Sequence, residues 1–286
     1  MTRRRVAAIG IAIAIAAATT AAQQGPVFTL AWVDRQGVRT PVGPLPPGTF
    51  APRLSPDGRR VAFDAGGSIW IADLANLAAA RRLGPGQFPI WSADGRRLMF
   101  AGPYGFQLYW QAADGSGEAE RIADQPARAP ESWSTALGLV SYITLTGTGD
   151  YDIWTFSPAD GSLRALIAEP TSAQMGSRFS PDGKWIAYQS NETGRFEVYV
   201  EPFPRTGAGA RVRISDAGGE RPVWSPDGRE IVYDKNATLY AVSVTTGPAL
   251  ASRAPVALPI SGFIQATGRR LWDLAPDGTR FLMMFP

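Results

Sequence analysis

Short apolar runs alternate with polar turns along almost the whole chain, and one four-residue turn returns five times. In such a turn proline presets φ, aspartate accepts hydrogen bonds from nearby backbone N–H groups, and glycine adopts a positive φ. The pattern therefore predicts five tight turns between strands, with the aspartate and glycine of each as structural residues. The copies are Ser55-Pro56-Asp57-Gly58, Ser92-Ala93-Asp94-Gly95, Ser180-Pro181-Asp182-Gly183, Ser225-Pro226-Asp227-Gly228 and Ala275-Pro276-Asp277-Gly278.

The residues around each turn repeat as well. A large apolar residue precedes the turn, and a short apolar run such as Val61-Ala62-Phe63 follows it. A run with a central aromatic residue comes next, such as Ile69-Trp70-Ile71, and a fourth segment closes the unit. Short apolar runs bounded by turn residues are typical of strands. Each unit is predicted to form four antiparallel strands.

The long interval between the second and third turns contains one more unit. Trp133-Ser134 stands where a turn is expected to begin, and Val140-Ser141-Tyr142, Ile153-Trp154-Thr155 and Leu166-Ile167 follow as strands. This unit has lost its Pro-Asp-Gly turn. The chain therefore holds six units at a spacing of about 44 residues, which is the period of a four-stranded propeller blade.

The two ends of the chain complement each other. Residues 29–43 resemble the third and fourth strands of a unit, and residues 268–286 resemble the first and second. Joining them closes a ring and removes exposed sheet edges. We predict an all-β, six-bladed β-propeller of 24 strands over residues 27–286, whose last blade is built from both termini and pairs residues 29–43 beside 280–285.

Residues 1–22 differ from the rest of the chain. Residues 1–5 carry three arginines, residues 6–18 are apolar, and Thr20-Ala21-Ala22 are small. This order is typical of a secretory signal peptide, and the apolar run is shorter than the roughly 20 residues of a spanning helix. We predict export to the periplasm or the cell exterior, cleavage near Ala22, and no stable membrane insertion afterwards. The alternative is an uncleaved N-terminal anchor.

Charge and composition exclude several function classes. The chain has 28 Lys+Arg and 25 Asp+Glu, and residues 1–22 contribute the excess, so no basic face for nucleic acid is expected. The sequence has no histidine and no cysteine. Histidine-based triads, thiolate nucleophiles, disulfides and His or Cys metal sites are therefore excluded. We predict no cofactor and no metal.

The repeated units resemble a known family. "IWIADL" (69–74), "EVYVEPFPRTG" (197–207) and "PVWSPDGREIVY" (222–233) resemble the WD40-like propeller repeats of the TolB-like superfamily. With "LAWVDRQG" (30–37), "LYWQAADGSGEAERI" (108–122) and "DGTRFLMMFP" (277–286), they are similar to the propeller region of bacterial receptor-like serine/threonine kinases. The resemblance covers residues 27–286. It implies a propeller that holds a partner or ligand at its face or in its channel.

The sequence lacks parts of both groups of proteins that it resembles, the receptor-like kinases and TolB. It has no Gly-rich loop, no strand lysine with a partner glutamate and no His-Arg-Asp loop, so we expect no kinase. We also expect no counterpart of the α/β domain of TolB, since nothing of domain size precedes residue 27 in this sequence. The resemblance therefore implies the propeller and its binding role, without TolB's role in the Tol–Pal system.

The candidate binding residues precede the turns, on the first strand of each unit, which lines the channel of a propeller. They are polar and differ between copies, and function tends to appear where copies differ because the fold needs only what they share. Clustered arginines are suited to hold an anion through forked hydrogen bonds; the alternative is a hydrated wall of balanced charge. The set is Arg53, Gln87, Glu131, Gln174, Arg178, Glu220, Arg221 and Arg270.

We consider three functions for a propeller with these candidate binding residues. We predict a non-enzymatic, monomeric binding module for an envelope protein or a small ligand. The first alternative is a glycosidase or lyase, for which Glu131 and Glu220 would have to lie within about 10 Å of each other at the channel mouth. The second alternative is a scaffold in an envelope complex.

Overall fold

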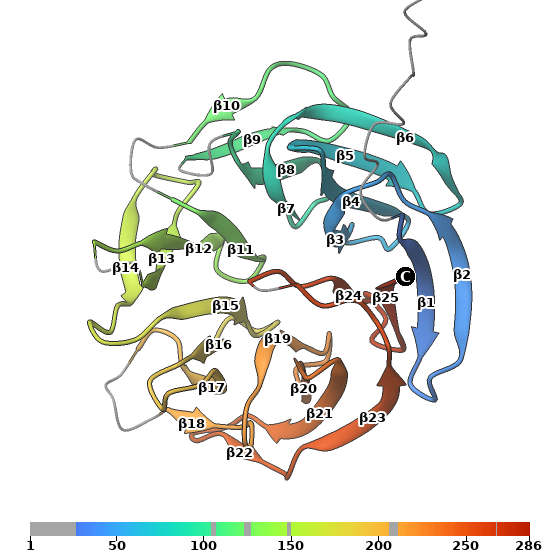
Figure 1. Ribbon diagram of the computed structural model, residues 1–286. Helices are drawn as coiled ribbons and strands as arrows, with labels where there is room; N and C mark the ends of the chain where they lie inside the picture. The colour runs from blue at the N-terminus through green and yellow to red at the C-terminus, as the bar shows by residue number, and fades with distance from the viewer. Residues whose placement is uncertain (1–26, 104–106, 123–126, 148–149, 206–210, 267) are drawn as a thin grey trace, which may run out of the picture.

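Six antiparallel sheets stand around a central axis in the computed structural model (Figure 1). The structure describes residues 27–103, 107–122, 127–147, 150–205, 211–266 and 268–286. The predicted signal peptide, residues 1–22, lies outside these ranges. The described part of the chain contains no helix long and apolar enough to cross a membrane.

Each sheet is one blade, with its first strand nearest the axis (Figure 1). In the following order of blades, the strands run from the axis outward. The first blade contains β3 (Thr49–Leu54), β4 (Arg60–Ala65), β5 (Ser68–Asp73) and β6 (Asn76–Pro85), and the second contains β7 (Gln87–Trp91), β8 (Arg97–Ala101), β9 (Leu108–Ala112) and β10 (Glu120–Arg121). The third blade contains β11 (Ala129–Ser134), β12 (Leu139–Leu145), β13 (Tyr151–Phe156) and β14 (Leu163–Ile167), and the fourth contains β15 (Gln174–Phe179), β16 (Trp185–Ser190), β17 (Glu197–Pro202) and β18 (Val212–Arg213). The fifth blade contains β19 (Glu220–Trp224), β20 (Glu230–Lys235), β21 (Thr238–Thr245), then β22 (Ala251–Ser252) and β23 (Val256–Ser261), and the sixth contains β24 (Trp272–Leu274), β25 (Arg280–Phe285), β1 (Thr29–Asp34) and β2 (Arg39–Pro44).

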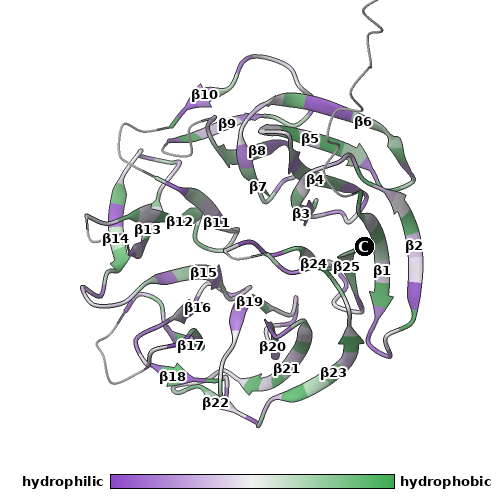
Figure 2. Ribbon diagram, in the orientation of Figure 1, coloured by the Kyte–Doolittle hydropathy of each residue, from purple (hydrophilic) through white to green (hydrophobic). Residues whose placement is uncertain are grey.

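The predicted all-β, six-bladed architecture is confirmed. The described residues form 25 strands, one more than predicted, because β22 and β23 both pair with β21 at the outer edge of the fifth blade. The unit that lost its turn is a complete blade, β11 to β14. The middle strand β5 is largely apolar and buried, whereas the outer strands β6 and β10 carry polar segments (Figure 2).

The ring closes through β1 and β25. These strands pair antiparallel, with Thr29 opposite Phe285 and Asp34 opposite Arg280. Strand β2 pairs with β1 on the outside and β24 pairs with β25 on the inside. The predicted closure by the two termini is therefore confirmed.

The recurring turns form a second ring at one end of the blades. In the turn of the fourth blade, Asp182 Oδ1 accepts hydrogen bonds from Ser180 Oγ at 2.6 Å and from the backbone N–H of Lys184 at 3.1 Å. In the fifth blade, the Ser225 hydroxyl is the main reason why the pKa of Asp227 lies below its usual value. The turn glycines have φ between +66° and +72°.

Each of these glycines faces the turn of the preceding blade. A Cβ built on Gly278 would meet Pro226 at 3.1 Å, and one built on Gly58 would meet Pro276 at 3.3 Å. In the fourth blade, a Cβ on Gly183 would meet Leu137 at 2.8 Å, since the third blade has no turn proline. Glycine is therefore required here both for its backbone conformation and for close packing between blades.

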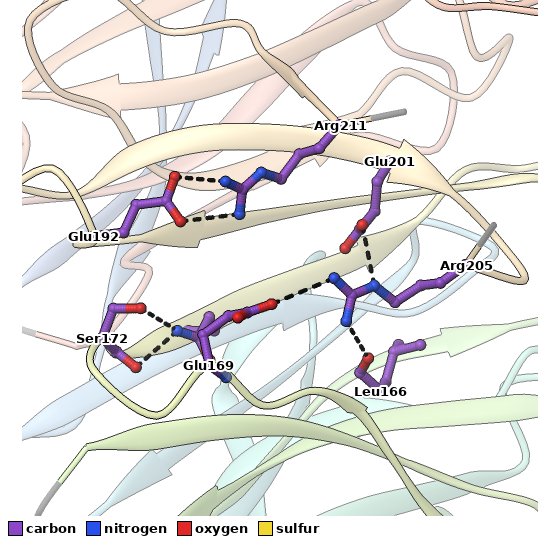
Figure 3. A network of polar contacts seen from close by, with 8 residues as sticks. Leu166, Glu169, Ser172, Glu192, Glu201, Arg205 and Arg211 are labelled. Carbon is purple, nitrogen blue, oxygen red and sulfur yellow. Dashed lines mark hydrogen bonds and ion pairs between the residues drawn. The ribbon is translucent and has the colours of Figure 1, made fainter. Parts of the chain in front are cut away.

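Arg205 links the outer part of the fourth blade to the third, where it also pairs with Glu169 at 3.4 Å, and other ion pairs brace the fourth blade itself (Figure 3). Arg205 pairs through Nε with the buried Glu201 at 3.1 Å, and its Nη1 donates to the carbonyl of Leu166 in the third blade at 3.1 Å. Arg211 forms a two-pronged contact with Glu192, at 2.9 and 2.7 Å. Such forked contacts fix direction as well as charge.

Shortening a closure-strand side chain should open a cavity in the core. Leu282, on β25, is fully buried, and we expect Leu282→Ala to lower the free energy of unfolding by about 2–5 kcal/mol. Val38, in the neighbouring turn, is 61% exposed, and Val38→Ala should leave stability nearly unchanged. Urea unfolding followed by tryptophan fluorescence measures both. Equal effects of the two substitutions would contradict a packed closure.

Candidate functional site

A cavity of about 380 Å³ lies at one end of the channel. Six of the eight predicted residues line it, namely Arg53, Gln87, Glu131, Arg178, Arg221 and Arg270. A second hollow, of about 290 Å³, is lined by residues of the turns and shares some of the same side chains. The residues common to both hollows, which we call the throat, are Arg53, Ile90, Glu131, Arg178 and Arg270.

A repeated bulge shapes the innermost strands at the cavity. The pairing of the first and second strands shifts register in five blades, and in four of them the shift contains a residue with positive φ. A β-bulge bends a strand and changes the direction of its side chains. The positive-φ residues are Ala51, Phe88, Gly176 and Arg221.

A side chain of the preceding blade binds the backbone of three of these bulges. The N–H of Phe88 donates to Asp64 Oδ2 at 3.0 Å, that of Gly176 to Glu131 Oε1 at 2.5 Å, and that of Arg221 to Gln189 Oε1 at 2.7 Å. A positive φ at a non-glycine residue costs about 1–3 kcal/mol and persists where the surroundings enforce it. These contacts between blades therefore fix the geometry of the cavity wall.

Two of the throat arginines, Arg53 and Arg178, lie in an environment that disfavours their charge. Burial, followed by the charge of Arg270, holds the pKa of Arg53 well below its usual value. The same two causes lower the pKa of Arg178 to about 9. Arg53 donates through Nη1 to the carbonyls of Pro52 at 2.7 Å and Arg270 at 3.0 Å. Among the described residues, none accepts a hydrogen bond from the Arg178 guanidinium.

Glu131 is bound to the fourth blade. Besides the N–H of Gly176, its carboxylate accepts the N–H of Ser177 at 2.8 Å and the Ser177 hydroxyl. Burial raises the pKa of Glu131 in spite of these donors. This carboxylate therefore holds the bulge of β15 in place.

Gln174 and Glu220 are not among the residues that line the cavity. Gln174 is fully buried, and its amide donates to the carbonyl and the hydroxyl of Ser172, both at 2.7 Å. Glu220 is partly exposed and lies 3.2 Å from Arg221. The expected pairing of Glu131 with Glu220 across the channel mouth is therefore not formed within the cavity.

Other residues at the cavity were not predicted. Arg269 pairs with Asp64 at 2.8 Å, donates to Gln87 at 2.9 Å, and lies over the ring of Phe88 at 4.3 Å. Asp234, which is 1% exposed, pairs with Arg221 at 2.5 Å. Asp64, Gln189 and Asp234 hold the same position in their second strands, where other blades have Ala101, Ile143 and Met284. The residue at this second-strand position therefore differs between copies, as the residues at the predicted first-strand positions do.

The cavity has a strong excess of basic side chains. Glu131 is the one acidic residue among those that line it. Aspartates behind the wall pair with three of the arginines: Asp64 with Arg269, Asp234 with Arg221, and Asp273 with Arg270. No group of three or more acidic side chains suited to a metal occurs in the described ranges. The arginines that line the cavity are Arg53, Arg128, Arg178, Arg221, Arg269 and Arg270.

Solved structures show the same fold. A TolB structure from Agrobacterium tumefaciens is similar with a TM-score of 0.69 at 18% identity, covering 92% of this chain and 100% of the other. TolB from Acinetobacter baumannii follows with a TM-score of 0.59 at 15% identity, covering 90% of this chain and 63% of the other. The chain is therefore a TolB-like six-bladed propeller in its fold.

Sequence comparison adds a weak similarity over part of the chain. No family model matches the chain. A protein of Emericella nidulans named dipeptidyl-peptidase 5 is 25% identical over 211 residues, which cover 62% of this chain. The match spans 29% of the fungal protein, so less than a third of that protein's length is represented.

The buried Glu131 gives a pH-dependent contribution to stability. Because its pKa is higher in the folded protein than its ordinary value of 4.5, the folded state binds more protons above pH 4.5. The free energy of unfolding should therefore fall in the wild type, relative to Glu131→Gln, as the pH rises from 4.5. Urea unfolding at a series of pH values measures the difference. The exposed Glu118→Gln serves as the control, and parallel profiles for wild type and Glu131→Gln would contradict the assignment.

Proposed function

We propose that the protein is a non-enzymatic binding module that holds an anionic group of an envelope protein or small ligand in the cavity. The observation that carries this proposal is the set of six arginines lining one cavity beside a single glutamate. Arginine recognises carboxylate and phosphate through forked, charge-assisted hydrogen bonds. The TolB-like fold supports a binding role.

The chemistry of the cavity favours binding over catalysis. Its one lining carboxylate, Glu131, is occupied by three donors from Gly176 and Ser177. A glycosidase needs two carboxylates placed on either side of the bond that breaks. The residues described at the cavity do not provide such a pair.

We also propose that the protein acts after export, in the cell envelope. The charged start, the apolar run and the small residues up to Ala22 support this, as does the similarity to propellers of receptor-like kinases. N-terminal sequencing of the protein from the periplasmic or extracellular fraction should give a first residue close to Gln23. Recovery of the uncleaved chain in the membrane fraction would instead indicate an anchor.

Binding through the cavity is tested by comparing one cavity variant with one surface variant. Arg178→Gln removes a throat charge, whereas Arg229→Gln removes an exposed charge in the turn between β19 and β20. Immobilised wild type and both variants are exposed to envelope extract, and the retained molecules are quantified by mass spectrometry. We expect a set retained by the wild type and Arg229→Gln and reduced about tenfold by Arg178→Gln, the loss of one charge-assisted contact. Equal retention by all three proteins would contradict the proposal.

A further inference from the structure

We propose, resting on the function above, that the ligand of the cavity is a single carboxylate attached to an apolar group. The carboxylate lies between Arg178 and Arg270 in the throat, and the apolar group lies against the cavity wall. A free organic acid and the C-terminal residue of a polypeptide share this chemistry.

Arg270 provides the first line of support. Its side chain is 6% exposed, yet its Nε and Nη1 are buried without a hydrogen-bond partner among the described residues. Nη1 lies 2.9 Å from Asp273 Oδ1, an ion pair that lacks the geometry of a hydrogen bond. A buried donor without an acceptor costs about 1–3 kcal/mol. Arg270 also lines both hollows, so a ligand in the throat can accept from the part of its guanidinium group that faces the cavity.

Arg178 provides the second. It lines both hollows, and no described residue accepts a hydrogen bond from it. The Arg270 charge is near enough to contribute to the lowered pKa of Arg178. An anion placed between the two guanidinium groups would offset their repulsion and accept from both.

The charge of the throat favours a monoanion. It contains the arginines at 53, 178 and 270, together with Glu131, and Asp273 is paired with Arg270. Three cations and two carboxylates leave one positive charge. The remaining paired arginines of the wall, Arg221 and Arg269, are already neutralised by aspartates. Arg128, the sixth arginine of the cavity, lies outside the throat. Within the throat a dianionic phosphate would therefore exceed the positive charge by one, which is costly for buried groups.

Part of the remaining wall is apolar, beside the polar side chains of Gln87, Gln189 and Tyr151. Phe88, Ile90, Ile143 and Met175 line the cavity, together with four prolines, Pro89, Pro103, Pro130 and Pro222. These side chains offer no hydrogen bonds to a sugar or a second phosphate, whereas they would remove a hydrocarbon group from water. A volume of about 380 Å³ is within the range of small-ligand sites.

Isothermal titration calorimetry with the purified protein tests this assignment. The probes are hexanoate, its uncharged analogue hexanamide, inorganic phosphate, and the peptide Gly-Gly-Leu as free acid and as C-terminal amide. We expect hexanoate or the peptide acid to bind at least about tenfold more tightly than its amide and than phosphate. Binding by hexanoate alone identifies a free acid as the source. Binding by the peptide acid alone identifies a chain terminus.

Variants locate the site. Arg178→Gln should weaken the binding of the carboxylate probe about tenfold, and the surface control Arg229→Gln should leave it unchanged. Arg178→Lys, which keeps the charge without the planar fork, should be intermediate. Thermal unfolding curves establish that each variant is folded. If Arg178→Gln does not fold, the binding of the carboxylate probe by Arg178→Lys tests the role of Arg178.

Two results would overturn this inference without touching the proposed function. The first is phosphate binding as tightly as the carboxylates, which would leave an anion site of a different class. The second is binding of none of these probes by a protein that still shows the Arg178-dependent retention of envelope molecules. Loss of that retention together with the absence of binding would overturn both proposals.

Discussion

The pairing of β1 with β25 is the constraint on which the rest of the molecule depends. It joins residues that are separated by almost the whole chain, since Thr29 lies opposite Phe285. The two sides of the resulting seam meet at the axis, where Arg53 Nη1 donates to the carbonyl of Arg270 at 3.0 Å and the N–H of Leu54 donates to Asp273 at 2.9 Å. Two of the throat arginines therefore lie beside each other only because the ring is closed.

The same seam is fastened on its outer side. Arg35, between β1 and β2, donates to the carbonyl of Gly278 and pairs with Glu230 of the fifth blade at 2.6 Å. Arg39 donates to the carbonyl of Ser261 at 2.6 Å. Exposed ion pairs contribute little free energy one by one. Here the contacts of Arg35 and Arg39 fix the orientation of β1 and β2 against their neighbours, whereas the buried residues of β1 and β25 provide most of the stability.

The repeats made the fold predictable, because turn chemistry and strand patterning agree in every unit. Even the blade without its turn was recognisable, since Val140 and Ile153 keep the strand pattern. The cavity was predictable only where it lies on the first strands. Arg269 stands in a loop before β24, and Asp64 and Asp234 stand on second strands, where the sequence pattern shows an ordinary strand end.

Gln174 was predicted to belong to the site, but it does not line the cavity. It precedes a turn and is polar, as the other candidates are, but its side chain folds back onto Ser172 and Glu169. A first strand has two sides, and the bulge changes which of them faces the axis. The φ of +70° at Gly176 that produces this change follows from contacts with the third blade. Such contacts between blades cannot be derived from one repeat alone.

A nearly neutral propeller can thus contain a cavity of strongly positive character. The acids and bases balance over residues 23–286, yet six of the arginines meet at one end of the channel. Aspartates on second strands neutralise the arginines at the wall, as Asp64 does for Arg269. No described residue forms an ion pair with Arg178 in the throat. The ring therefore concentrates positive charge without an ion-pair partner in the throat, and a charge-assisted hydrogen bond is stronger at a buried position than in water.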